Sequence, residues 1–247
     1  MTESVDALRR EKPGAEQPAD GDVVAAPARS QRLAVVHAGT SPQASTKLLA
    51  DRLTVGVCDE FRRRGVRLEV SVIDLRRLSG DISAALISGL PGEQLDAVVP
   101  QLAEADGIIA ATPIYKAEAS GLFSSFFHVL ERDLLIGKPV LLAATAGTVR
   151  HSLVLDHQVR ALFAYMRALI TPTSVFAAPE DWGGALLEQR VDRAARELRV
   201  LMQLDFGQHI DTAAGSYQKD FGSTASGDEP VDVTTDMMRL AAGGSLR

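Results

Sequence analysis

Residues 33–65 read LAVVHAGTSPQASTKLLADRLTVGVCDEFRRRG. The first five residues form a short apolar run of the kind that makes a buried strand. A loop rich in Ser and Thr follows, and then an amphipathic segment from about 46 to 64, closed by Gly65, which indicates a long helix. The stretch therefore predicts a strand–loop–helix unit, the repeating element of a parallel sheet with crossover helices.

The same alternation continues along the chain. Further strands are expected at 67–74, 107–112, 139–144 and 170–176, and further helices at about 94–105, 121–133, 152–168 and 185–203. The second strand alternates between apolar and polar residues, and the fifth contains Pro172, which cannot donate to a ladder, so both belong at sheet edges. We therefore predict an α/β fold, a doubly wound five-stranded parallel sheet in the order 2-1-3-4-5 with helices on both faces. Ser120 is the expected N-cap of the helix at 121–133.

The net charge of −6 comes from the two ends of the chain. Residues 1–30 carry six acidic and four basic side chains, residues 205–247 carry seven and three, and the stretch between them is neutral. Both ends lack a sustained apolar pattern. We predict a disordered tail at 1–30, one domain at 31–205, and a mostly disordered tail at 206–247 with a weak helix near 236–242.

Composition excludes several classes of protein. The neutral core has no basic patch for nucleic acid, and no apolar run approaches the roughly 20 residues of a membrane helix. The N-terminus lacks the apolar centre of a signal peptide, and the single cysteine, Cys58, has no internal disulfide partner and is expected to pack as a small hydrophobe. His151 and His157 have no third ligand at metal spacing, so no metal site is predicted. The expected location is the cytoplasm.

The loops after the first, third and fourth strands are expected to converge on one ligand in a crevice at the carboxyl edge of the sheet. The first loop, AGTSPQAST at 38–46, is neither a dinucleotide fingerprint nor a P-loop. Its hydroxyls and backbone N–H groups at a helix N-terminus suit one terminal phosphate. The alternative is a helix cap that binds no ligand.

The other two loops offer an aromatic side chain and a small-residue backbone. In TPIYKAEASG at 112–121, Tyr115 either packs on a ring system or simply covers the edge of the core. In AATAGTVRH at 143–151, the small residues either let N–H groups approach a flat heterocycle or form an ordinary glycine turn.

Taken together, TPIYKAEASGLF at 112–123 and TAGTVRHSLVLDH at 145–157 resemble the NAD(P)H-dependent FMN reductases of the flavodoxin-like superfamily. The likeness covers about residues 32–203. Within that family, the stretch 145–183 is similar to the branch partnered with luciferase-like two-component monooxygenases. The resemblance implies FMN and NADPH or NADH as cofactors, a homodimer or homotetramer, and delivery of reduced FMN to a flavin-dependent monooxygenase.

The resemblance also assigns the three loops to parts of FMN. The first loop would hold the phosphate, through Thr40, Ser41, Gln43, Ser45 and Thr46. The second would line the ribityl chain and one edge of the isoalloxazine, through Pro113, Ile114, Tyr115 and Lys116. The third would meet the pyrimidine edge, through Thr145, Ala146, Gly147 and Thr148, with His151 nearby.

Two residues depart from the family pattern. Many relatives carry an arginine where this chain has Gln43. Relatives of the alkanesulfonate-linked branch often carry an aromatic where this chain has Ala119, and in that branch the aromatic is linked to a bulged helix and to flavin acting as a substrate rather than as a bound group.

In the implied reaction, hydride passes from the nicotinamide to flavin N5, and we expect no catalytic acid or base from the protein. Lys116, Arg150 and His151 are candidates for steering the NAD(P)H phosphates. An FMN-bound quinone, azo or nitro reductase is the alternative enzyme. A flavodoxin-type electron carrier is the non-enzymatic alternative, and the neutral core disfavours it because such carriers are strongly acidic.

Two apolar features suggest further contacts. The helix at 121–133 carries a wide apolar stripe, and one edge of that stripe is expected to meet another subunit. Trp182 is placed either over the site or at such an interface, with neither position preferred.

Overall fold

The computed structural model describes residues 30–213. The tail predicted at 1–30 lies outside these residues apart from Ser30. Of the tail predicted at 206–247, the structure describes only 206–213, so the helix expected near 236–242 also lies outside them.

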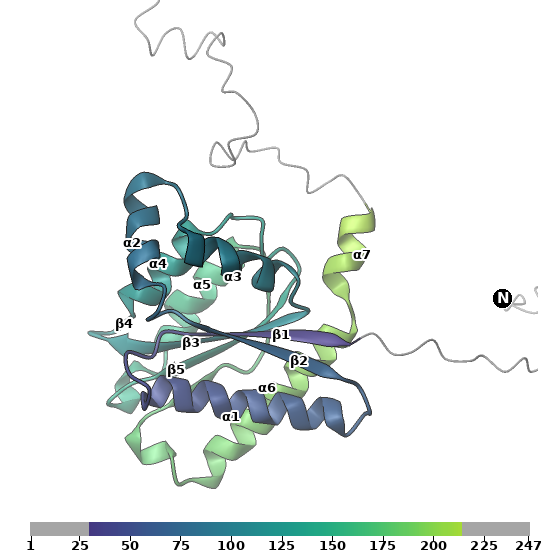
Figure 1. The fold of residues 1–247 in the computed structure, drawn as a ribbon. Coiled ribbons are helices and arrows are strands. Elements are labelled where there is room, and N and C mark those ends of the chain that lie inside the picture. Colours follow the sequence, from purple (N-terminus) through teal and green to yellow (C-terminus); the bar gives the residue numbers. More distant parts are fainter. Residues whose placement is uncertain (1–29, 214–247) are drawn as a thin grey trace, which may run out of the picture.

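A parallel sheet forms the centre of the fold (Figure 1). Its strands are β1 (Gln31–His37), β2 (Leu68–Asp74), β3 (Gly107–Tyr115), β5 (Pro139–Thr145), β6 (Leu169–Ile170) and β7 (Val175–Ala177). The order is β2-β1-β3-β5, followed by β6 and β7, which both pair with β5. A two-residue strand, β4 (Glu118–Ala119), pairs antiparallel with the end of β3. The predicted order 2-1-3-4-5 is confirmed, and the fifth strand is divided into two pieces.

The division lies at Pro172, between β6 and β7. Backbone groups that leave the ladder there are bonded by side chains from two helices. Arg160 donates to the carbonyls of Thr171 and Pro172, at 3.3 and 3.5 Å. Glu197 accepts from the backbone N–H and the hydroxyl of Thr173, at 2.7 and 2.8 Å. The proline therefore interrupts an edge strand, and the side chains replace the lost ladder bonds.

Helices cover both faces of the sheet (Figure 1). One face is covered by α1 (Ser45–Arg62) and α6 (Ala185–Gln203), and the other by α2 (Ser79–Ser88), α3 (Glu93–Ala103), α4 (Gly121–Val129) and α5 (Arg160–Tyr165). Alternate residues of β1 supply the two cores, because successive side chains of a strand point to opposite faces. On α1 every fourth residue is buried against the sheet, at Leu49, Leu53, Val57 and Phe61. None of the helices within residues 30–213 is both long enough and apolar enough to cross a membrane.

Helix α2 and helix α7 (Phe206–Ala213) were not expected. Helix α2 buries only Ile82 and Ala85, which is too sparse a pattern to show as helical periodicity in the sequence. Helix α7 continues the chain past the predicted domain boundary at 205. It packs where Gly137 leaves room, since a Cβ at Gly137 would lie 3.0 Å from the Cα of Gly207.

The wide apolar stripe of α4 is buried within the chain. Phe123, Phe126 and Phe127 are at most 2% exposed, and the rings of Phe127 and Phe163 lie 4.7 Å apart. Helix α2, which was not expected, packs against α4 and covers part of the stripe, and the contact predicted between its edge and another subunit stays a prediction. Helix α4 ends at Val129, four residues before the predicted end, and it is a regular α-helix.

The helix expected at 152–168 is irregular. A 3₁₀ turn at Val149–His151 precedes it, and within it a π-helical turn at Leu155–Val159 leads into α5. Wide turns of this kind inside helices are frequent at functional sites. The 3₁₀ turn lies within the third predicted loop, and the π-helical turn begins four residues after that loop, so the irregularity lies beside the predicted site.

Candidate functional site

The carboxyl ends of β1, β3 and β5 bring the three predicted loops to one edge of the sheet, the side of Figure 1 on which β4 is labelled. The first and third loops are in direct contact. The hydroxyls of Thr46 and Thr145 lie 2.7 Å apart, and the hydroxyl of Ser45 donates to that of Thr145 at 3.3 Å. Residues 99 and 100 positions apart in the sequence are thereby joined in one site.

The N-terminus of α1 carries no side-chain cap. Ala44 occupies the N-cap position, and the surrounding hydroxyls do not bond the helix end. Within residues 30–213, the N–H groups of Ser45, Thr46 and Lys47 have no hydrogen-bond acceptor. The helix dipole places positive charge at these donors, so the end of α1 offers an anion site rather than a closed cap.

The predicted phosphate residues differ in accessibility. Four are exposed around the end of α1, namely Thr40, Ser41, Gln43 and Ser45. Thr46 is only 1% exposed, and its hydroxyl is engaged by Thr145. The loop therefore presents four accessible polar side chains above a buried hydroxyl pair.

A buried imidazole lies beneath this loop, which the sequence analysis did not single out. His37, the last residue of β1, is 2% exposed, and its Nδ1 has no hydrogen-bond partner within the described residues. A Cβ placed on Gly39 would lie 3.5 Å from both this Nδ1 and the N–H nitrogen of Lys47. Burial lowers the pKa of His37 from its ordinary value of 6.5, and the carboxylate of Asp74 opposes that effect. The only sequence signal was a histidine at the end of an apolar strand.

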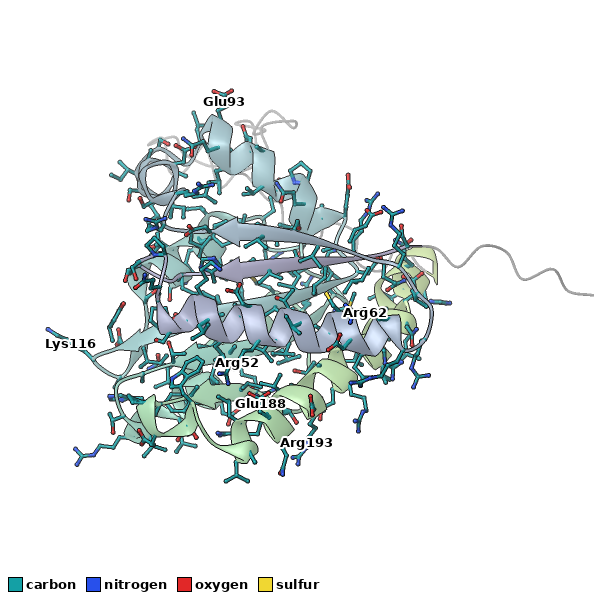
Figure 2. The ribbon with its side chains drawn as sticks, turned by 60° about the horizontal axis from the view of Figure 1, so that its bottom comes forward. Arg52, Arg62, Glu93, Lys116, Glu188 and Arg193 are labelled. Carbon is teal, nitrogen blue, oxygen red and sulfur yellow. The ribbon has the colours of Figure 1, made fainter. Side chains whose placement is uncertain are left out.

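The second loop is largely a hairpin. Strand β3 continues to Tyr115, and Glu118 of β4 pairs back with it, so Lys116 and Ala117 alone form the turn. Both have positive φ, 51° and 66°, as in a type I′ turn. The twist of this turn matches that of the flanking strands, and its two central positions are most often occupied by Asn and Gly. Figure 2 shows Lys116 projecting outward from this tip. Pro113 and Ile114 are buried, whereas Tyr115 is 52% exposed and available to a ligand.

Ser120 directly follows the hairpin and fulfils its predicted role. Its side-chain oxygen accepts a hydrogen bond from the backbone N–H of Phe123 at 3.2 Å, which caps α4. Its own N–H donates to the hydroxyl of Thr112 at 3.1 Å. These bonds fix the return of the chain from the sheet edge into α4.

The third loop exposes unpaired backbone donors. Thr145 is buried, and the N–H of Ala146 donates to the carbonyl of Ala177 at 3.2 Å, but in the described part of the chain the N–H groups of Gly147 and Thr148 bond to nothing. A Cβ added to Gly147 would meet no atom within 4 Å. The loop therefore leaves open space beside two free N–H groups. His151 is half-buried in the following 3₁₀ turn.

Other titratable groups do not add a reactive centre to this edge. Between residues 30 and 213, no group of three or more His, Cys, Asp or Glu side chains is placed to hold a metal ion. Burial raises the pKa of the Cys58 thiol, and Cys58 lies near the C-terminal end of α1, whereas the site is at the N-terminal end of that helix. The site is thus built chiefly from hydrogen-bond donors, which suits the binding of a phosphorylated, polar-edged ring.

Trp182 lies on the α1–α6 face of the sheet. Its ring stacks beneath the guanidinium of Arg52 at 5.1 Å, and Arg52 in turn pairs with Glu188 at 2.8 Å. Figure 2 shows Arg52 and Glu188 on the adjoining helices α1 and α6. The indole therefore helps to hold these two helices together.

Comparisons with known proteins agree with this architecture. Residues 31–183 match the family described as NADPH-dependent FMN reductase. The chain is 32% identical over 151 residues to FMN reductase (NADPH) of Pseudomonas aeruginosa, covering 61% of this chain and 78% of that protein. It is 30% identical over 176 residues to the NADH-dependent FMN reductase SfnE of Pseudomonas putida, covering 69% and 90%.

A solved structure shows the same fold at higher sequence identity. An oxidoreductase from Corynebacterium diphtheriae superimposes with a TM-score of 0.69 at 43% identity, covering 71% of this chain and 98% of that one. The match spans more than half of the chain and includes all three loops. The chain therefore belongs to the NADPH-dependent FMN reductase family and is a flavodoxin-like oxidoreductase that uses FMN and NAD(P)H.

Proposed function

We propose that this chain transfers hydride from NADPH or NADH to FMN and supplies the reduced FMN to a partner flavin-dependent monooxygenase. The observation that carries the proposal is the pair of backbone donor sets, on one sheet edge, that have no acceptor within the described residues. The free N–H groups at the start of α1 suit a phosphate, and those of Gly147 and Thr148 suit the polar edge of a flat ring. FMN presents a phosphate at one end and a pyrimidine edge at the other.

The roles of the site residues follow from this placement. The phosphate would be held by Thr40, Ser41, Gln43, Ser45 and Thr46, and the ribityl chain and ring edge would be lined by Pro113, Ile114, Tyr115 and Lys116. The pyrimidine edge would be met by Thr145, Ala146, Gly147 and Thr148, with His151 beside it. The open space at Gly147 is the observation that favours a close approach of the ring.

Bound FMN supplies the atom that accepts hydride, so the protein needs no side-chain acid or base. The N–H groups of Gly147 and Thr148 would stabilise negative charge at the pyrimidine edge of FMN, because fixed backbone dipoles need no reorganisation. Lys116 and Arg150 are exposed and His151 is half-buried, and these three side chains would steer the phosphates of the nicotinamide cofactor.

A second candidate function is supported by one feature of the fold. Helix α4 is a regular α-helix, and Ala119 stands where the alkanesulfonate-linked relatives often carry an aromatic. The feature linked to flavin as a released substrate is therefore missing from this position. This favours the alternative in which FMN stays bound and electrons go to quinones, azo dyes or nitro compounds.

The visible spectrum of the purified protein, followed by NADPH and NADH oxidation with and without added FMN, separates the two. A colourless protein whose turnover requires added FMN supports delivery to a partner. A yellow protein that reduces quinones without added FMN supports the bound-flavin reductase. A protein that neither binds FMN nor oxidises NAD(P)H refutes both.

The proposal extends to the setting of the enzyme. We place it in the cytoplasm, as a homodimer or homotetramer built on the domain at 31–205, with a luciferase-like monooxygenase as its partner. The support for this partner is the likeness of residues 145–183 to the corresponding branch. Light scattering on the purified chain measures the oligomeric state. Oxygenation by a candidate monooxygenase in the presence of NAD(P)H and FMN, with this chain as the only reductase, tests the partnership.

A further inference from the structure

We propose that Gln158 is a positioning residue for the flavin ring, because its side chain fixes the hairpin that carries Tyr115 and Lys116. The inference rests on the proposed function, since it concerns how the same site is held ready for FMN. Gln158 comes from the π-helical turn at Leu155–Val159, and its Nε2 donates to the carbonyl oxygen of Ala117 at 3.2 Å. The contact joins residues 41 positions apart.

The hairpin needs support from outside. Strand β4 has two residues, and only two residue pairs connect it with β3. An isolated pairing of this length is marginal in water. Its turn also places two residues with side chains, Lys116 and Ala117, in the left-handed region that glycine and asparagine prefer. The turn thus carries conformational strain, and few ladder bonds oppose its opening.

The π-helical turn supplies a fixed anchor for Gln158. Leu155 and Val159, on either side of it, are 1% and 2% exposed and belong to the core. The next residue, Arg160, holds the broken edge strand through Thr171 and Pro172. Gln158 therefore projects from a segment that is held by the core and by the sheet edge, and it reaches the turn of the hairpin, whose two residues Lys116 and Ala117 are exposed.

The conformation of the hairpin should affect the binding of the flavin ring. Tyr115 and Lys116 are exposed, and they directly precede Ala117, whose carbonyl accepts the bond from Gln158. The positions of their side chains therefore depend on the conformation of the turn. Figure 2 shows how far the tip of the hairpin stands out from the rest of the fold. Holding the turn before FMN arrives lowers the ordering cost of binding. Gln158 should therefore act on FMN affinity and leave the hydride-transfer step itself unchanged.

The test is the full-length Gln158→Ala variant. Loss of one exposed neutral hydrogen bond should raise the Kd for FMN, measured by quenching of flavin fluorescence, about two- to tenfold. The KM for FMN should rise with it, while kcat at saturating FMN stays unchanged. Gln158→Glu keeps the length of the side chain but loses the donor, so it should behave like the alanine variant. The matched control is Gln101→Ala, which removes a similar amide-to-carbonyl bond to Ala97 on α3.

A second variant tests the strain directly. Ala117→Gly relieves the left-handed turn without touching Gln158. In that background, Gln158→Ala should change the FMN Kd less than twofold. Additive effects of the two substitutions would overturn the proposal, as would an FMN Kd for Gln158→Ala equal to that of the wild type.

Limited proteolysis separates this inference from the proposed function. Trypsin cleaves after Lys116, so loss of the hydrogen bond should accelerate cleavage there in the flavin-free protein. If the wild type fails to bind FMN, the proposed function fails, and the cleavage rate still decides whether Gln158 holds the hairpin. Faster cleavage in Gln158→Ala, but not in Gln101→Ala, supports the clamp, and equal rates overturn it.

Discussion

Replacing Gly147 by alanine tests the flavin site with little expected effect on the fold. Gly147 is exposed, its φ lies outside the left-handed region, and an added Cβ would meet no atom within 4 Å. Alanine is therefore sterically acceptable in the free protein. Because the substitution also restricts the unfolded chain, the free energy of unfolding should stay the same or rise by up to about 1 kcal/mol.

The bound state is affected differently. The new methyl group projects about 1.5 Å from Cα into the space next to the N–H groups of Gly147 and Thr148. A ring edge that accepts hydrogen bonds from these N–H groups at about 2.9 Å loses them if the methyl group pushes it away by a similar amount. The pyrimidine edge of oxidised FMN is neutral, and leaving one of its polar groups without a partner costs about 1–3 kcal/mol, which corresponds to FMN binding weakened by about five- to 150-fold.

The assay compares FMN Kd, by flavin fluorescence quenching, with urea denaturation of the same samples. Gly80→Ala is the matched control, because Gly80 lies on α2 and its added Cβ would also meet nothing within 4 Å. The control should bind FMN like the wild type. An FMN Kd for Gly147→Ala within twofold of the wild type, in a protein that binds FMN, would refute the placement of the ring against the third loop.

Four further results are expected. Arg150→Ala should raise the KM for NAD(P)H more than the KM for FMN, because its exposed guanidinium attracts the nicotinamide phosphates; an unchanged nicotinamide KM would remove this role. Thr145→Val should lower the free energy of unfolding by about 1–3 kcal/mol, because it leaves the buried hydroxyl of Thr46 without a partner. The double variant Thr46→Val/Thr145→Val should recover part of this loss, and a fully additive loss would contradict the pairing of the two hydroxyls. The unfolded chain protonates His37 near pH 6.5 and the folded chain does so only at lower pH, so stability should fall as pH drops below about 6.5, by at most about 1.4 kcal/mol per pH unit for this proton. His37→Gln should flatten that part of the urea-denaturation profile between pH 5 and 8, and an unchanged slope would show that His37 does not titrate differently in the two states. Residues 30–213 alone should fold and bind FMN like the full chain, and loss of either property would show that the tails belong to the domain.

The strand order could be read from the sequence because local patterns encode it. Uniformly apolar runs mark β1, β3 and β5 as central strands, and the alternation in β2 marks an edge. The prediction of helices from the sequence failed where the apolar periodicity was weak. Helix α2 buries too few residues to show a face, and α7 follows a boundary that was set by composition alone.

By itself, the sequence determined the strand–loop–helix alternation, the family and the three loops at the carboxyl edge, because apolar periodicity and short motifs are local properties. Only the tertiary structure decided which groups meet. The bond between Thr46 and Thr145, the contact from Gln158 to Ala117 and the burial of His37 each join segments that are distant in the chain or lie under another element. Such contacts depend on how helices and strands pack, and no local pattern of residues encodes them.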